Sequence, residues 1–127
     1  MNWEKKAPDH KKRAIVIDDS SPRIETISQG LAEEFSVRTV SSPFKLLSML
    51  CTERPDLIVL NSSVPWFSTS HFCCALTHNG LLADTPIVLF NTENTSVNEG
   101  NVREFRNCHI IEDTRAISEA ARRLVSR

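Results

Sequence analysis

Short apolar runs alternate along this chain with segments whose apolar residues recur at helical spacing. The runs at 14–17 and 57–60 contain only alanine, valine, isoleucine and leucine. Unbroken runs of this length, bounded by turn residues, are typical of strands buried on both faces. The pattern predicts three further short strands at 37–40, 86–90 and 108–111.

Five helices are expected between and after these strands. Ser21 with Pro22 and Ser42 with Pro43 each combine an N-cap residue with a proline at the first helical position. Thr114 is the expected cap of the last helix. The third and fourth helices are expected near 70–79 and 92–107. The expected inward-facing residues are Ile24, Ile27, Leu31 and Phe35, then Phe44, Leu47, Leu50 and Cys51, then Phe72, Ala75 and Leu76, then Val97, Val102 and Phe105, and finally Ile117, Ala121 and Leu124.

Strands that alternate with helices predict an α/β fold, in which right-handed crossovers place helices on both faces of a parallel sheet. The chain has 127 residues, which suits one such domain. We expect a doubly wound, five-stranded parallel sheet over 13–127. Residues 1–12, rich in lysine, are expected to form a basic, flexible N-terminal extension.

The overall charge points to no strongly charged partner. The chain carries 15 Lys and Arg against 16 Asp and Glu, a net charge of −1. This balance does not demand a nucleic acid or an anionic membrane. The sequence has no apolar stretch long enough to span a bilayer, and its four cysteines lack a paired metal spacing. We expect a cytoplasmic protein with no membrane and no nucleic acid partner.

Polar side chains follow two of the predicted buried strands. Asp18 and Asp19 come directly after the first strand, and Asn61 ends the third. Open α/β sheets bind ligands at the carboxyl ends of their strands. An aspartate at residue 61 would complete an acidic pocket able to hold Mg²⁺ and accept a phosphoryl group. Asparagine removes that nucleophile.

The order and spacing of these segments resemble the CheY-like receiver domain of bacterial response regulators, over 13–127. The matching pieces are IVIDDS at 15–20, RPDLIVLN at 54–61 with Pro65 after it, and TPIVLFN at 85–91. The thirty-residue step from Asn61 to Asn91 suits the family's spacing between its phosphoacceptor and hydroxyl positions. The resemblance implies the flavodoxin-like (β/α)5 fold and a role in two-component phosphorelay signalling.

The resemblance also identifies what this sequence lacks. Receivers carry a phosphoacceptor aspartate at the position of Asn61, a threonine or serine at that of Asn91, and a lysine at that of Glu112. Only the acidic pair Asp18 and Asp19 is retained. An amide nitrogen is a poor nucleophile, because its lone pair is delocalised into the carbonyl. At about 5 Å and an effective dielectric of about 20, Glu112 would repel a phosphoryl oxygen by roughly 3 kcal/mol.

The retained acidic pair has two possible roles. Asp18 and Asp19 can cap the first helix and favour its N-terminus, or they can keep weak Mg²⁺ binding, which we expect to be millimolar at best. We expect no other cofactor. Glu112 can also contact a loop backbone or Arg115 in place of the pocket.

Several other residues are functional candidates. His109 stands where receivers often carry an aromatic switch residue, although it can equally be an ordinary strand histidine. Trp66, in the loop after Asn61, can anchor a partner or seal the pocket. Three residues on one face of the third predicted helix have the spacing of a zinc site, but an exposed polar face is the simpler interpretation; they are His71, Cys74 and His78. Cys73 and Cys74 are expected to be packing thiols.

The leading hypothesis from the sequence is a pseudo-receiver: a signalling domain, not an enzyme, that binds a protein partner without aspartyl phosphorylation. The family's usual output surface falls at 96–127, and its basic rim would be Arg115, Arg122 and Arg123. The partner can be another signalling protein or a second copy of the chain. One alternative is a phosphorylatable receiver with a different acceptor, namely Ser62, Ser63 or Asp56. A redox or ligand sensor is the other.

Overall fold

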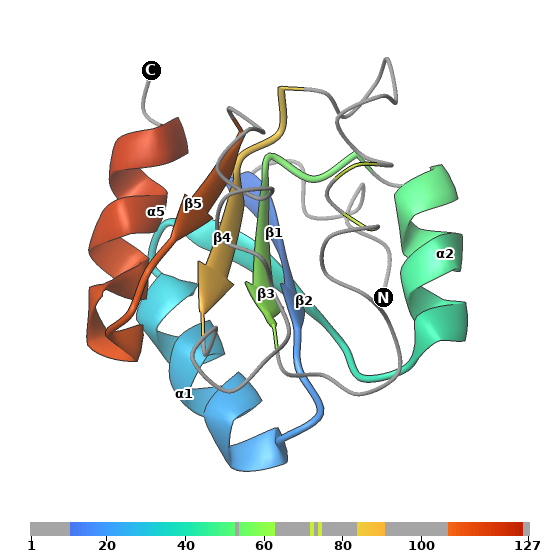
Figure 1. Cartoon of the computed structure of the whole chain (residues 1–127), viewed down its shortest axis with the longest axis horizontal. Helices are drawn as coiled ribbons and strands as arrows, with labels where there is room; N and C mark the ends of the chain where they lie inside the picture. Colours follow the sequence, from blue (N-terminus) through green and yellow to red (C-terminus); the bar gives the residue numbers. More distant parts are fainter. Residues whose placement is uncertain are drawn as a thin grey trace.

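A parallel five-stranded sheet lies at the centre of the computed structural model (Figure 1). The structure describes residues 11–52, 54–62, 72, 74, 84–90 and 107–125. The strand order is β2-β1-β3-β4-β5, and every neighbouring pair is parallel. The elements are β1 (Lys12–Ile17), α1 (Ser21–Leu31), β2 (Phe35–Val40), α2 (Pro43–Thr52), β3 (Leu57–Asn61), β4 (Ile87–Phe90), β5 (Cys108–Ile110), a 3₁₀ turn (Thr114–Ala116) and α5 (Ile117–Val125). The predicted doubly wound α/β sheet is confirmed.

Helices cover both faces of the sheet, and each face has its own apolar core. Helix α2 packs on one face, where Leu46 and Met49 meet alternate residues of the strands. Helices α1 and α5 lie together on the opposite face (Figure 1), where Ile27, Leu31 and Ile117 are buried. All of β3 and β4 is buried, as their unbroken apolar runs predict.

The start of α1 and the start of β2 differ from the prediction. Ser20, not Ser21, is the N-cap, and its side chain accepts a hydrogen bond from the Arg23 backbone nitrogen at 3.5 Å. Phe35 belongs to β2, not to α1. It nevertheless shares a core with Ile27 and Leu31, because the strand returns beside the helix it follows. The helical spacing of Phe35 is therefore coincidental.

The last helix also begins differently. Asp113, not Thr114, caps the 3₁₀ turn, and its carboxylate accepts a hydrogen bond from the Arg115 backbone nitrogen at 2.9 Å. Ile117 and Ala121 are buried as predicted, and Leu124 packs against the same core.

Helices α1 and α5 approach closely at Gly30. A Cβ atom there would lie 2.6 Å from Ser118 Oγ of α5. The absence of a side chain thus permits this contact, although glycine costs helix stability. One turn further along α5, Arg122 Nη1 lies 3.4 Å from Glu34 Oε1 in the turn after α1.

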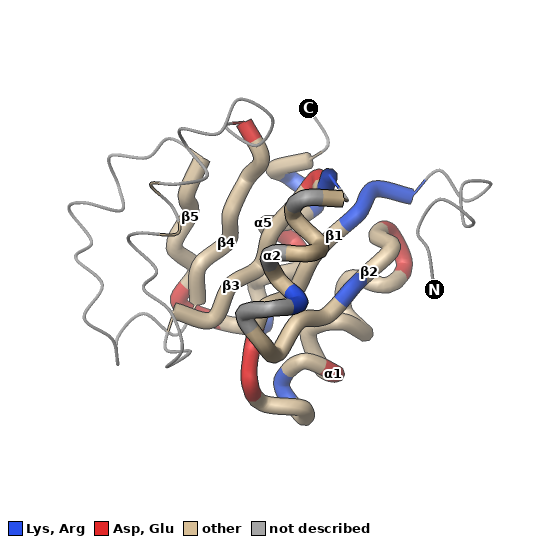
Figure 2. Tube along the Cα trace, turned by 90° about the vertical axis from the view of Figure 1, so that its right-hand side faces the viewer, with Lys and Arg blue, Asp and Glu red and all other residues tan. Residues whose placement is uncertain are grey.

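Charged residues lie mainly on the helices, in the turns and at the ends of the strands, although Arg38 lies within β2 (Figure 2). Strand β1 begins at Lys12, so the sheet includes the last residue of the predicted extension. Residues 1–10 lie outside the described part. Nearly all of the third and fourth predicted helices also lies outside the described part. Within it, Phe72 and Cys74 of the third predicted helix are helical. Within the described ranges, no helix is long and apolar enough to cross a membrane.

Candidate functional site

The polar residues after β1 and β3 meet at the carboxyl end of the sheet. Ile17 pairs with Leu60 in the parallel register, so Asp18 and Asn61 follow side by side. Asn61 Nδ2 donates a hydrogen bond to Asp18 Oδ1 at 2.8 Å. Both side chains are buried, with exposed fractions of 0% for Asp18 and 1% for Asn61. The structure therefore brings together two of the residues singled out from the sequence.

An arginine that the sequence analysis did not select completes this strand-end cluster, defined here as Asp18, Asp19, Arg23 and Asn61. Arg23, in the first turn of α1, donates from Nε to Asp18 Oδ2 at 2.6 Å and from Nη2 to Oδ1 at 3.0 Å. This is a two-point contact of guanidinium with carboxylate, the strongest common geometry for such a pair. Positive charge at a helix N-terminus is unfavourable by itself. The position of Arg23 in the first turn of a predicted helix was therefore the one feature of the sequence that could have indicated an acidic neighbour.

The backbone also donates to Asp18. The amide nitrogens of Asp19 and Ser20 lie 2.7 and 3.3 Å from Oδ1. The carboxylate thereby fixes the turn between β1 and α1, since these amides have no partner in the sheet. These amides precede α1, whose N-cap is Ser20, so Asp18 holds the turn before the helix and does not cap the helix as one interpretation of the sequence expected.

The surroundings of Asp18 favour its charged form. Burial by itself raises the pKa of this carboxyl group. The hydrogen bonds from Arg23 and Asn61, the positive charge of Arg23 and the Asp19 amide act in the opposite direction, and together they lower the pKa below its usual value. The same hydrogen bond raises the pKa of Arg23. Asp18 is thus a fully bonded, ionised carboxylate, which is poorly suited to act as a nucleophile or a general base.

This lowered pKa predicts a specific loss of stability in acid. Because the folded pKa lies below the unfolded value of about 3.9, ionised Asp18 stabilises the fold above that pH. The contribution is lost as the pH falls through the folded pKa. We expect the free energy of unfolding to fall more steeply below about pH 4 in the wild type than in Asp18→Asn. Urea unfolding followed by circular dichroism measures this; equal pH slopes would contradict it.

Asp19 is placed differently from Asp18. Its side chain is 44% exposed, and its Oδ1 lies 3.8 Å from Arg23 Nη2. An exposed pair at this distance contributes at most about 1 kcal/mol. Asp18 and Asp19, which we considered together in the sequence, therefore have unequal roles in the fold.

The structure describes only some of the other residues that the resemblance places near the phosphorylation site. Glu112 is exposed after β5. His109 lies half-buried on β5, opposite Val88 of β4. Asn91 and Trp66 fall outside the described residues, so the expectations for them stay predictions.

The residues with zinc-site spacing lie mostly outside the described part of the chain. His71, Cys73 and His78 lie outside them, and Cys74 is exposed. Among the residues the structure describes, no group of three or more metal-binding side chains occurs.

Two alternative phosphoacceptors occupy unsuitable places. Ser62 follows Asn61 but is only 6% exposed. Asp56 lies before β3, at the amino end of the strands, where its Oδ2 accepts a hydrogen bond from the Arg13 backbone nitrogen at 2.8 Å. Asp56 is therefore at the opposite end of the sheet from the strand-end cluster. Ser63 lies outside the described residues.

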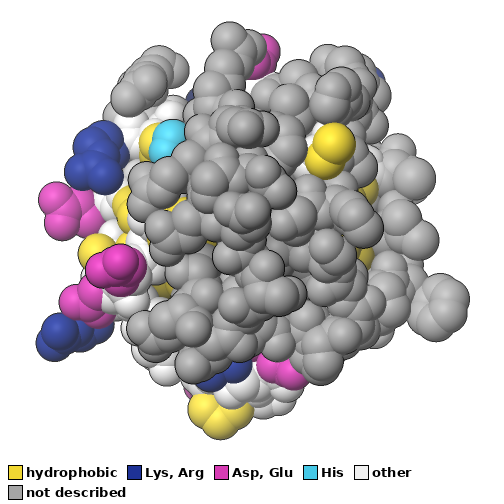
Figure 3. Space-filling model, viewed as in Figure 1, with side chains coloured by type: hydrophobic (Ala, Val, Ile, Leu, Met, Phe, Trp, Pro, Cys, Tyr) yellow, Lys and Arg dark blue, Asp and Glu magenta, His cyan; other side chains and the backbone are white. Residues whose placement is uncertain are grey.

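The arginines of the expected basic rim have acidic neighbours. Arg115 Nη2 lies 3.1 Å from Asp113 Oδ2, and Arg122 pairs with Glu34. Arg122 and Arg123 are exposed on α5. Both acidic and basic side chains lie along the flank formed by α5 (Figure 3). The described part of this surface is therefore mixed in charge, not uniformly basic.

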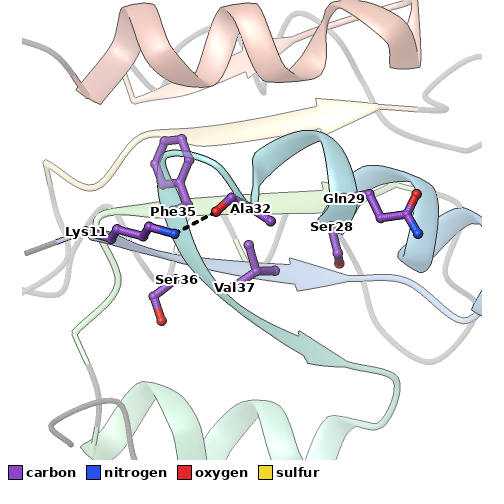
Figure 4. A pocket seen from close by; sticks show the side chains of 7 residues that line it. All are labelled: Lys11, Ser28, Gln29, Ala32, Phe35, Ser36 and Val37. Atoms are coloured by element: carbon purple, nitrogen blue, oxygen red, sulfur yellow. Dashed lines mark hydrogen bonds between the residues drawn. The ribbon is translucent and has the colours of Figure 1, made fainter. Parts of the chain in front are cut away.

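A hollow of about 400 Å³ lies between α1 and β2 (Figure 4). It is lined by Lys11, Ser28, Gln29, Ala32, Phe35, Ser36 and Val37. Lys11 Nζ reaches across it to the Ala32 carbonyl oxygen at 3.0 Å. Apart from Lys11, which precedes β1, the lining residues come from the end of α1, the turn after it and the beginning of β2, so the hollow is separate from the strand-end cluster.

Comparison with known proteins finds the same fold in many solved structures. No protein-family model and no curated protein matches the sequence. The chemotaxis response regulator CheY4 of Vibrio cholerae superposes with a TM-score of 0.76 and 17% identity, covering 90% of this chain and 98% of that one. The N-terminal receiver domain of a Bacteroides fragilis response regulator superposes with a TM-score of 0.75 and 21% identity, covering 92% of this chain and 98% of that one.

A third similar structure is the Mn²⁺-bound form of response regulator Rcp1, with a TM-score of 0.74 and 14% identity over 90% of this chain and 94% of that one. These identities are low, but the superpositions extend over nearly the whole chain. The strand order, the two helical layers and these matches lead to one structural conclusion: the chain has the fold of a CheY-like response regulator receiver domain.

Proposed function

We propose that this chain is a receiver-like signalling module that binds a protein partner without aspartyl phosphorylation. The observation that carries the proposal is the Asn61 side chain. It ends β3, where the sequence resemblance expects the phosphoacceptor, and its amide nitrogen donates to buried Asp18. An amide held in this way offers no nucleophilic oxygen of carboxylate strength.

The neighbouring residues do not replace the missing acceptor. Asp18 is buried, and its two oxygens already accept hydrogen bonds from Arg23, Asn61 and the backbone. Glu112 adds negative charge where the resemblance expects lysine. We therefore infer a two-component signalling domain, acting in the cytoplasm, that performs no catalytic step of its own.

Intact-mass measurement tests the absence of phosphorylation. We expect no stable adduct after incubation with acetyl phosphate and Mg²⁺, because Asn61 offers no carboxylate at the acceptor position and Asp18 is buried and already hydrogen-bonded. A phosphorylatable receiver treated in parallel is the positive control. An added phosphoryl mass that mild base removes would overturn the proposal.

The proposed partner surface includes α5, with Arg122 and Arg123 exposed on it and Arg115 in the turn before it. Trp66, which follows β3 in the sequence, remains a proposed contact. Arg122 is the most useful probe, because its contact with Glu34 connects it to the turn after α1. A single substitution there changes both the surface charge and this ion pair.

A charge exchange separates these two effects. We expect Arg122→Glu and the double variant Glu34→Arg/Arg122→Glu both to weaken binding of a purified partner by about tenfold or more. The double variant restores an opposite-charge pair within the chain but keeps the reversed charge on α5. Calorimetry or surface plasmon resonance measures the affinity.

Glu34→Gln is the matched control, since it breaks the ion pair and leaves Arg122 in place. We expect it to bind the partner with wild-type affinity. Recovery of binding in the double variant would mean that Arg122 acts through Glu34 and not through the partner.

A further inference from the structure

The receiver fold raises the question of whether this chain can hold a divalent cation beside Asp18. Mg²⁺ binds oxygen ligands in a near-ideal octahedron, through one or two carboxylates and several waters. A carboxylate oxygen can serve as such a ligand only if a lone pair points at the metal. The bonding of Asp18 therefore decides whether the site fits.

Most of the lone pairs of Asp18 are already used. Its Oδ1 accepts from the Asp19 and Ser20 amides at 2.7 and 3.3 Å, from Arg23 Nη2 at 3.0 Å and from Asn61 Nδ2 at 2.8 Å. Its Oδ2 accepts from Arg23 Nε at 2.6 Å. A carboxylate offers about four lone-pair positions in total. Oδ1 therefore has no lone pair left for a metal, and a metal on the remaining lone pair of Oδ2 would lie close to the Arg23 guanidinium.

The charge of the cluster also disfavours a divalent cation. Arg23 supplies one positive charge against the negative charges of Asp18 and Asp19, and it lies within 3.8 Å of an oxygen of each. Asn61 contributes a neutral side chain and directs its donor nitrogen at Asp18. A metal placed beside Asp18 would meet a nearby guanidinium and only one unneutralised carboxylate.

We propose that Arg23 is the permanent internal cation of the strand-end cluster, and that its guanidinium occupies the coordination positions a divalent metal would need on Asp18. The residues present do not fit a divalent cation while Arg23 stays in place. Asn61 and Arg23 thus exclude the metal together. This inference is independent of the proposed function, because it concerns only the contents of the cluster and not what binds to α5.

Manganese binding, followed by the loss of the free Mn²⁺ signal in electron paramagnetic resonance, tests the proposal directly. We expect the wild type to bind Mn²⁺ with a dissociation constant in the millimolar range or weaker. Asn61→Asp should remain weak as well, because Arg23 still neutralises Asp18. Arg23→Gln/Asn61→Asp should bind at least about tenfold more tightly than Asn61→Asp, since a positive charge is removed from beside the metal.

Two controls separate this local effect from others. Arg122→Gln/Asn61→Asp removes one positive charge on α5 and should bind within about twofold of Asn61→Asp. Arg23→Lys/Asn61→Asp keeps the charge and should also stay weak, which provides a second variant if Arg23→Gln does not fold.

Submillimolar Mn²⁺ binding by the wild type would overturn the proposal. So would a folded Arg23→Gln/Asn61→Asp variant that gains less than twofold, or an Arg23→Lys/Asn61→Asp variant that gains tenfold. Partner affinity is not used as a readout, so failure here leaves the proposed protein-binding function to its own test.

Discussion

Asp18→Ala should lower the free energy of unfolding by about 3–5 kcal/mol at pH 7, whereas Asp19→Ala should change it by less than about 0.5 kcal/mol. The two residues are neighbours with the same chemistry, so the difference comes from their surroundings. Asp18 is fully buried and is the common acceptor of its cluster. Removing it takes a buried acceptor away from the Asn61 amide and from the backbone nitrogens of Asp19 and Ser20, and it takes the nearer of two carboxylates away from Arg23.

Urea unfolding monitored by circular dichroism gives both values. Asp18→Asn is the matched control, because it keeps the shape and one acceptor oxygen but removes the charge. We expect its stability to lie between those of the wild type and Asp18→Ala. Equal losses in Asp18→Ala and Asp19→Ala would mean that the hydrogen bonds to Asp18 do not contribute as the geometry indicates.

The sheet could be predicted from the sequence because its central strands are buried on both faces. Such strands have no polar side, so 57–60 and 86–90 read as nearly unbroken apolar runs. The alternation of strands and helices then limits the topology to a parallel, doubly wound sheet. The strand order confirms that reasoning.

Element boundaries were less predictable, because several residues in succession can serve as caps. Ser20 and Ser21 are chemically identical, and only the extended backbone at Ser20, with φ of −104° and ψ of 112°, makes it the N-cap. Asp113 and Thr114 are likewise both common cap residues, and the extended backbone at Asp113 makes it the N-cap of the 3₁₀ turn. A hydrophobic residue such as Phe35 satisfies both a helical and a strand pattern. Tertiary packing decides between them.

The convergence of Asp18 and Asn61 was predictable, since neighbouring parallel strands end at the same edge of a sheet. The part played by Arg23 was not. A side chain in the first turn of a helix can extend into solvent or fold back over the preceding strand, and spacing alone does not distinguish the two. The contact of Arg122 with Glu34 was missed because the two residues are far apart in the sequence.

Restoring phosphorylation should require more than restoring the phosphoacceptor. We expect Asn61→Asp alone to react with acetyl phosphate and Mg²⁺ slowly, because Arg23 still neutralises Asp18, residue 91 lacks a hydroxyl and Glu112 stays negative. The triple variant Asn61→Asp/Asn91→Thr/Glu112→Lys should react at least about tenfold faster, since relief of a repulsion of roughly 3 kcal/mol at about 5 Å is more than sufficient for that change.

Adding Arg23→Gln to the triple variant should increase the rate again, by at least about tenfold, because it frees the Asp18 carboxylate for the metal. Intact-mass measurement over time gives the rate for each variant, with Arg122→Gln in the same triple background as the charge control. If Asn61→Asp reacted as fast as the triple variant, the assignment of residue 112 to the lysine position would be wrong. If the Arg23→Gln and Arg122→Gln backgrounds reacted equally fast, the guanidinium would not be what keeps the restored pocket inactive, and the missing chemistry would lie wholly in residues 61, 91 and 112.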